Sequence, residues 1–231
     1  MVFLTQFLAQ KGSCPMARDH LFGELAAFRC DVAAVRRYYE ACVEPTPSTP
    51  YFDNGANYVG WAVTSRDGTV HDGIKQIPVD PAKRKPGELP GRMAVKPTPL
   101  CDGPVRQLMD NLALLGLRTC RARFMALPDQ DFAMPWHADA KTESWGLHIP
   151  VITNPGAFFE WKFGNQVIRR HLPADGRAWF VRVDPQHRAV NQQRGAGTRV
   201  HLLMSLIENP APRRFGPDFV AIPAPSVAGT P

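Results

Sequence analysis

Two histidines and one aspartate are the residues of this chain whose types and spacing best suit a metal centre. His137 and Asp139 stand two positions apart in the segment MPWHADA, and residues at that spacing point to the same side of an extended backbone. His187, in the segment DPQHRAVN, is a third candidate ligand. Two neutral imidazoles and one carboxylate form the ligand set of non-haem Fe(II) oxygenases, which leaves coordination positions open for a chelating cosubstrate and for dioxygen. We therefore predict that these three residues bind one metal ion.

An arginine that follows the third candidate fits the same chemistry. Arg199 opens the strand-like segment RVHLLMSLI. A cosubstrate such as 2-oxoglutarate has a second carboxylate far from the metal, and a guanidinium holds such a group with two parallel charge-assisted hydrogen bonds. We expect Arg199 to bind this carboxylate; a surface arginine on an edge strand is the alternative.

Strand-like segments, one in the first half of the chain and six in the second, must position these side chains. β-Branched and aromatic residues separated by turn residues mark each of them. Their ranges are 58–64, 117–127, 146–153, 157–163, 166–172, 178–183 and 199–207. Gly164-Asn165 is expected to be a two-residue hairpin turn. Closely spaced strands of this kind are typical of a β-sandwich or barrel.

Helical patterns occupy the N-terminal part, 1–50, and one later segment. Asp31 is placed to cap the helix DVAAVRRYYEACV, and the preceding segment ARDHLFGELAAF has a similar apolar period. The later segment VRQLMDNLALLG predicts an amphipathic helix that ends at Gly116. Asp67-Gly68 indicates a β-hairpin after the first strand-like segment.

The organisation of the chain favours one domain over 1–231, because 231 residues can bury a single substantial core. The strand-rich core is expected to span 58–207. A segment rich in Pro, Lys, Arg and Gly, 77–104, is expected to be a loop inserted in it. The Pro-rich residues 209–231 are expected to form an extended tail.

Charge and composition exclude several classes of partner. The formal net charge is +6, but the longest basic block has three residues and no nucleic-acid-binding motif is present, so we expect no nucleic acid partner. No apolar stretch reaches the roughly 18 residues of a membrane helix, so we expect no membrane insertion. The five cysteines have no paired spacing, which favours reduced thiols and a cytoplasmic location.

Four motifs occur in an order that resembles a known enzyme family. They are W-H-x-D at 136–139, L-H-I-P-V-I-T-N-P at 147–155, H-x-x-V-N at 187–191 and R-V-H-L-L at 199–203. This order resembles the aspartyl/asparaginyl β-hydroxylase family of Fe(II)/2-oxoglutarate-dependent dioxygenases, which includes bacterial proline hydroxylases. The resemblance covers roughly 58–207. It implies a double-stranded β-helix, which is a cupin-like jelly-roll barrel, with the metal and the cosubstrate at its mouth.

The resemblance also implies roles for individual residues. His137, Asp139 and His187 correspond to the Fe(II) ligands, and Arg199 corresponds to the clamp on the far carboxylate of 2-oxoglutarate. O2 is the second cosubstrate. Three further positions correspond to residues near the cosubstrate: His148, Asn191 and His201. The implied reaction hydroxylates an unactivated C–H bond of an amino acid, free or within a peptide or carrier-bound intermediate, and releases succinate and CO2.

The substrate side of the site is less defined by the motifs. Many family members have an arginine two residues before the L-H-I-P histidine, and this chain has Gly146 there. Arg121 and Arg123 alternate with apolar residues along a strand; they face outward by default, and facing inward they would bind a substrate carboxylate. Trp136, beside the metal pair, is a third candidate substrate contact.

Two other functions are compatible with the same residues. A cupin-type zinc enzyme would use the His-Asp-His set for hydrolysis or isomerisation. A barrel without catalytic activity would only bind a small acid.

Overall fold

Two antiparallel sheets form most of the structure, a computed structural model that describes residues 20–52, 58–75, 93–128, 131–139, 145–207 and, for the backbone alone, 215–221. The larger sheet has the strand order β14-β1-β11-β8-β13-β6-β3-β2. Its strands are β1 (His20–Leu25), β2 (Thr49–Pro50), β3 (Val59–Ala62), β6 (Thr119–Leu127), β8 (Trp145–Ile152), β11 (Trp179–Arg182), β13 (Arg199–Leu206) and β14 (Phe215–Ala221).

The smaller sheet has the order β10-β9-β12-β7. Its strands are β7 (Phe132–Ala133), β9 (Ala157–Phe163), β10 (Gln166–Arg170) and β12 (His187–Asn191). A third, two-stranded sheet joins β4 (Thr64–Ser65) to β5 (Lys96–Pro97). Within the described ranges these pairings close no barrel, so the mainly β class is confirmed and the double-stranded β-helix stays a prediction.

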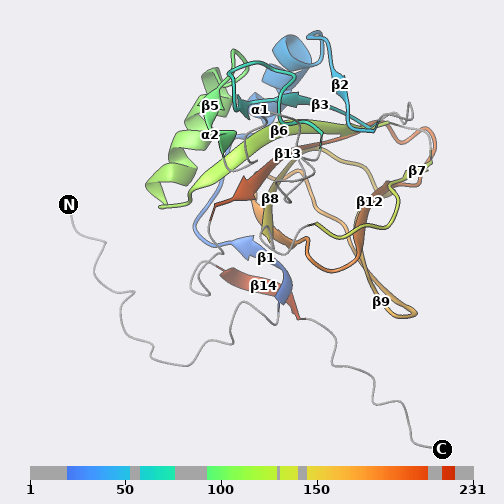
Figure 1. Ribbon diagram of the computed structural model, residues 1–231. Helices are drawn as coiled ribbons and strands as arrows, with labels where there is room; N and C mark the ends of the chain where they lie inside the picture. The colour runs from blue at the N-terminus through green and yellow to red at the C-terminus, as the bar shows by residue number, and fades with distance from the viewer. Residues whose placement is uncertain are drawn as a thin grey trace, which may run out of the picture.

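The helices α1 (Val32–Tyr38) and α2 (Gly103–Leu114) lie together on one side of the larger sheet (Figure 1). The Asp31 side chain accepts a hydrogen bond of 2.9 Å from the Ala34 backbone N–H, as a helix cap should. The chain continues after α1 as a π-helical turn, η2 (Tyr39–Val43). Apolar side chains of both helices and of the strands beneath them form the main core. None of the described helices has the length and apolarity needed to cross a bilayer.

The opposite face of the larger sheet carries the polar residues of interest. Leu203 on β13 is the cross-strand partner of Arg123 on β6 and of His148 on β8. Because directly opposed residues share a face and the side-chain period is two, Arg199 and His201 share that face with them. Strand pairing therefore gathers four cationic or titratable side chains over the side of the sheet away from the helices.

Part of the N-terminal prediction is wrong. The segment ARDHLFGELAAF was expected to be helical, but His20–Leu25 forms strand β1, which pairs with β11 and β14. All six residues are buried. A short apolar run fits either period, and Gly23 weakens a helix, so burial between two neighbouring strands decides the outcome. The helix that begins after Asp31 is confirmed.

Two other expectations also differ from the structure. Asp67-Gly68 does not form a hairpin between paired strands, because β4 pairs instead with β5, about thirty positions further along the chain. Residues 215–221, expected to lie in an extended tail, form strand β14. Residues 77–92 of the expected loop 77–104 lie outside the described residues. The hairpin at Gly164-Asn165, between β9 and β10, is confirmed.

Candidate metal and cosubstrate site

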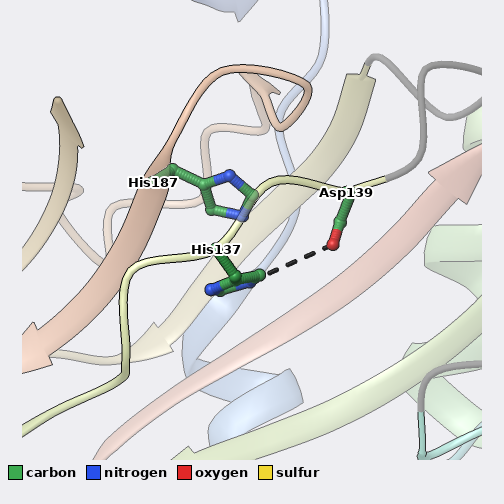
Figure 2. A group of neighbouring side chains, drawn as sticks. All are labelled: His137, Asp139 and His187. Carbon is green, nitrogen blue, oxygen red and sulfur yellow. Dashed lines mark ion pairs between the residues drawn. The ribbon is translucent and has the colours of Figure 1, made fainter. Parts of the chain in front are cut away.

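The three predicted metal ligands converge on one point between the two sheets (Figure 2). His137 and His187 exchange two backbone hydrogen bonds, of 3.1 Å and 2.7 Å, so their side chains lie directly opposite each other. The Asp139 N–H donates to the Val183 carbonyl at 2.8 Å, which fixes the carboxylate two positions after His137. One donor atom from each of the three side chains lies within 4.8 Å of the others.

Both imidazoles are held in the tautomer that a metal ligand needs. Nδ1 of His137 lies 2.9 Å from the Pro135 carbonyl, and Nδ1 of His187 lies 2.9 Å from the Pro185 carbonyl. A carbonyl only accepts, so each Nδ1 carries the proton and each Nε2 presents a lone pair. The spacing Pro-x-His occurs twice and builds the same support twice. Such supports orient metal-binding histidines.

The donor set fits a transition-metal ion after a small inward movement. Two ligands at right angles, each about 2.1 Å from an ion, are about 3 Å apart. Nε2 of His137 and Oδ1 of Asp139 are 4.0 Å apart, so the side chains must close by about 1 Å. Their side chains are 28% and 29% exposed, which leaves room for that adjustment. One face of the site stays without a protein ligand among the described residues.

His187 is the buried member of the set. Its ring stacks on Phe159 with centroids 5.2 Å apart and an interplanar angle of 13°. Burial, helped by the nearby His137, lowers the pKa of His187 to about 4. Its imidazole is therefore neutral at physiological pH, as a metal ligand must be.

A salt-bridged cluster braces the two histidine-bearing segments from their outer side. Glu160 is fully buried and accepts hydrogen bonds of 2.7 Å from Arg169 and from Arg188. Arg188 in turn lies 4.3 Å above the ring of Trp136. Trp136, predicted to contact substrate, is thus held under a cation outside the cavity, and its neighbour His137 is held in place with it.

Arg199 is buried beside this metal site, with 1% of its surface exposed. Its Nη2 donates to Nδ1 of His201 at 2.9 Å, whereas its Nη1 is buried without a hydrogen-bond partner. Among the described residues no carboxylate lies within salt-bridge distance of it. Burial lowers its pKa to about 10, so the guanidinium is still charged. A buried unpaired cation is costly, which indicates that an anion belongs there.

Two further histidines surround the arginine. His148 and His201 are both buried, and burial together with the charge of Arg199 holds the pKa of each well below its usual value. His201 accepts from Arg199, so its own proton is on Nε2. His148 lines the cavity, as expected of a residue near the cosubstrate. Both stay neutral and orient or flank the guanidinium without adding charge.

Asn191, expected near the cosubstrate, is a structural brace in this fold. Its amide group donates to the carbonyls of Pro128 and Gly197 at 2.9 Å and 3.0 Å, and its oxygen accepts from Asn154 at 3.0 Å. All of its side-chain groups are thereby used. The contacts secure the turn that precedes Arg199, so the residue acts on the site through that turn.

The two arginines of β6 have different positions. Arg121 donates to the carbonyls of Gly73, Ile74 and Lys75, and it does not line the cavity. The prediction that Arg121 contacts substrate therefore finds no support in its position. Arg123 does line the cavity.

The cavity itself has a volume of about 70 Å³ and is lined from both sheets. It brings together the three metal-ligand candidates, Arg199, His148, Arg123 and Gly146. Sequence reasoning missed its aromatic wall, Tyr51 and Tyr58. Tyr58 opens a segment predicted to be a strand, and neither tyrosine was assigned a role from the sequence.

Comparison with protein-family models and with curated proteins finds no match for this chain. Two solved structures are similar to it at low identity. One is an oxidoreductase of the 2OG-Fe(II) oxygenase family from Burkholderia pseudomallei, with 14% identity, a TM-score of 0.47, and coverage of 80% of this chain and 82% of that one. The other is a Pseudomonas putida prolyl-4-hydroxylase, with 12% identity, a TM-score of 0.47, and coverage of 83% and 94%.

Proposed function

We propose that this protein is an Fe(II)- and 2-oxoglutarate-dependent hydroxylase. The observation that carries the proposal is the buried guanidinium of Arg199, which has an unsatisfied Nη1 and shares one cavity with a His-Asp-His set. A metal-binding group and an unpaired cation in the same cavity suit a ligand that chelates a metal at one end and carries a carboxylate at the other. 2-Oxoglutarate has this chemistry.

Each residue of the site has a distinct part in this proposal. His137, Asp139 and His187 would hold the iron, with the carboxylate offsetting part of its charge. Arg199, oriented by His201, would bind the far carboxylate of 2-oxoglutarate, and Phe159 would keep water from one side of His187. When bound, iron, 2-oxoglutarate and O2 supply the oxidising power to hydroxylate an unactivated C–H bond, with release of succinate and CO2. The protein's own part is to position that bond and to exclude water.

The wider setting of this activity is also part of the proposal. The chain would act as one dioxygenase domain over 1–231, with a double-stranded β-helix as its catalytic core. Its substrate would be an amino acid, either free or within a peptide or carrier-bound intermediate. The protein would act in the cytoplasm.

The test is oxygen-dependent release of succinate from 2-oxoglutarate by protein loaded with Fe(II). We expect turnover by the wild type and by Arg170→Met, which removes an exposed arginine of β10. We expect none by His137→Ala or Arg199→Met. Turnover that survives His137→Ala would remove that residue from the ligand set. Tight Zn(II) binding without any effect of 2-oxoglutarate would instead favour a zinc enzyme.

A further inference from the structure

A second guanidinium in the cavity lacks a partner for its charge. Arg123 projects from β6 and is half-buried. Its Nη1 donates to the Arg121 carbonyl at 3.0 Å, whereas its Nε is buried without a hydrogen-bond partner. Among the described residues no carboxylate lies within salt-bridge distance of it. One edge of this guanidinium is thus fixed by the protein, and an N–H on the other side is left unsatisfied.

Other arginines of this chain show how such an edge is normally filled. In four pairs among the described residues, Nε and Nη2 of one arginine hold one carboxylate. These pairs are Arg66 with Asp72, Arg169 with Glu160, Arg177 with Asp175 and Arg182 with Asp184. This edge-on arrangement is the usual bidentate geometry for a carboxylate. Arg123 lines the cavity, and no acid of the described chain meets the Nε side of its guanidinium.

The surroundings of Arg123 place this edge close to the metal site and apart from the cosubstrate clamp. His148 and Arg123 are the cross-strand partners of Leu203 on either side of β13, and the rings of His148 and His201 have centroids 5.9 Å apart. Tyr51 lines the same cavity as Arg123 and Asp139. Arg199 and the β13 partner of Arg123 are four positions apart, which is about 13 Å along a strand. The two guanidiniums therefore start from well-separated points of the sheet.

The walls beside Arg123 suit a small organic group. Tyr51 and Tyr58 supply aromatic surface, and their rings lie 5.2 Å apart. Gly146 also lines the cavity. A Cβ atom at that position would come within 3.3 Å of Nε2 of His148, so glycine keeps space open beside that histidine.

We propose that Arg123 forms a second anion subsite, which binds the carboxylate of a small carboxylic acid substrate next to the metal and is separate from the 2-oxoglutarate subsite at Arg199. This inference rests on the proposed function and narrows its substrate class. A carboxylate held by Arg123 would leave the rest of a small acid directed toward the aromatic wall and the metal ligands. An amide in place of the acid would lose the charge-assisted pair.

The experiment uses full-length protein loaded with Mn(II), with and without 2-oxoglutarate, under calorimetric titration. The probes are the free L-amino acids and each corresponding amino acid amide. We expect at least one acid to bind the wild type, with its amide at least about 30-fold weaker. Arg123→Met should weaken the binding of that acid by a similar factor and leave the Kd for 2-oxoglutarate within about twofold of the wild-type value. Arg170→Met, the same substitution at an exposed site, should match the wild type.

Three results would overturn the inference: no acid of the set binds, an amide binds as tightly as its acid, or Arg123→Met binds the acid as the wild type does. An equal loss of 2-oxoglutarate affinity in Arg123→Met and Arg199→Met would also overturn it, because Arg123 would then belong to the cosubstrate subsite. Failure of the wild type to bind 2-oxoglutarate at all counts against the proposed function. Acid binding without 2-oxoglutarate then tests Arg123 by itself.

Discussion

Replacing Arg199 with methionine should raise the stability of the ligand-free protein and abolish its response to 2-oxoglutarate. The substitution removes a fully buried positive charge that no described carboxylate neutralises. Methionine fills much of the same space with an apolar chain. Most substitutions of a buried residue destabilise a protein, so a gain in stability is an unusual outcome that follows from this site alone.

The size of the gain follows from the pKa of the arginine. Burial lowers this pKa from its ordinary value to about 10, which corresponds to a cost of about 3 kcal/mol for the charged form. The folded state binds the proton less tightly than the unfolded state. The cost is therefore complete below pH 10 and disappears as the pH rises toward 12.5. Loss of the hydrogen bond to His201 offsets about 1 kcal/mol, so a net gain of about 2 kcal/mol is expected at pH 7.

Differential scanning calorimetry measures both effects. A gain of about 2 kcal/mol should raise the Tm of a chain of this size by about 5 °C. With Mn(II) and 2-oxoglutarate at a hundredfold excess over Kd, the free energy of unfolding of the wild type should rise by about 2.7 kcal/mol. Arg199→Met should gain almost nothing, because losing a buried charge pair weakens binding by about 2–5 kcal/mol. Arg170→Met serves as the matched control.

The reasoning would be refuted by a ligand-free Arg199→Met that is less stable than the wild type and still gains stability from 2-oxoglutarate. The first result would show that the charge is neutralised within the chain. The second would show that the cosubstrate carboxylate binds elsewhere.

Three further predictions concern the supports of the site. Arg188→Met removes the side chain that contacts both Glu160 and the Trp136 ring. It should weaken Mn(II) binding at least about tenfold, whereas Arg170→Met should not; equal affinities would show that this cluster does not support the metal site. Buried neutral histidines bind fewer protons than unfolded ones, so the free energy of unfolding should fall as the pH drops below 6.5. In urea unfolding between pH 6 and 5, His148→Gln should reduce the slope of this free energy against pH by about 1 kcal/mol per pH unit. An unchanged slope would contradict the burial of a neutral His148. Asn191→Ala should cost about 2–4 kcal/mol in urea unfolding and change 2-oxoglutarate affinity only modestly; a stable variant that fails to bind would make the asparagine a direct contact.

Local patterns predicted the elements whose signals are strong and short-range. The cap at Asp31, the hairpin at Gly164-Asn165 and most strands of the core follow from side-chain chemistry within a few residues. β1 was mistaken for a helix because its burial comes from β11 and β14, which lie far away in the sequence. Strand β12 was not expected, since HRAVN is too short and polar to show a period of its own.

The candidate site shows the same division. His137 and Asp139 are close in sequence, so their shared direction was predictable, and the position of His187 followed from chemistry. The surroundings of Trp136 and Asn191 depend on contacts with other segments: Arg188 lies over the Trp136 ring, and Asn191 bonds to loop residues. Their predicted roles stay predictions. The distinction between Arg121 and Arg123 depends on the backbone: Arg121 has a positive φ of 52°, which breaks the alternation that a regular strand would impose.

The most direct test of the central claim is an anaerobic titration of the protein with Fe(II) in the presence of 2-oxoglutarate. Its readout is the visible absorption band that arises only when a keto acid chelates ferrous iron. The account predicts that the band saturates at one iron per chain in the wild type, requires much more 2-oxoglutarate in Arg199→Met, and is absent in His137→Ala. A wild type without the band, or a band of equal intensity in His137→Ala, would contradict the proposal that these residues hold iron and its cosubstrate together.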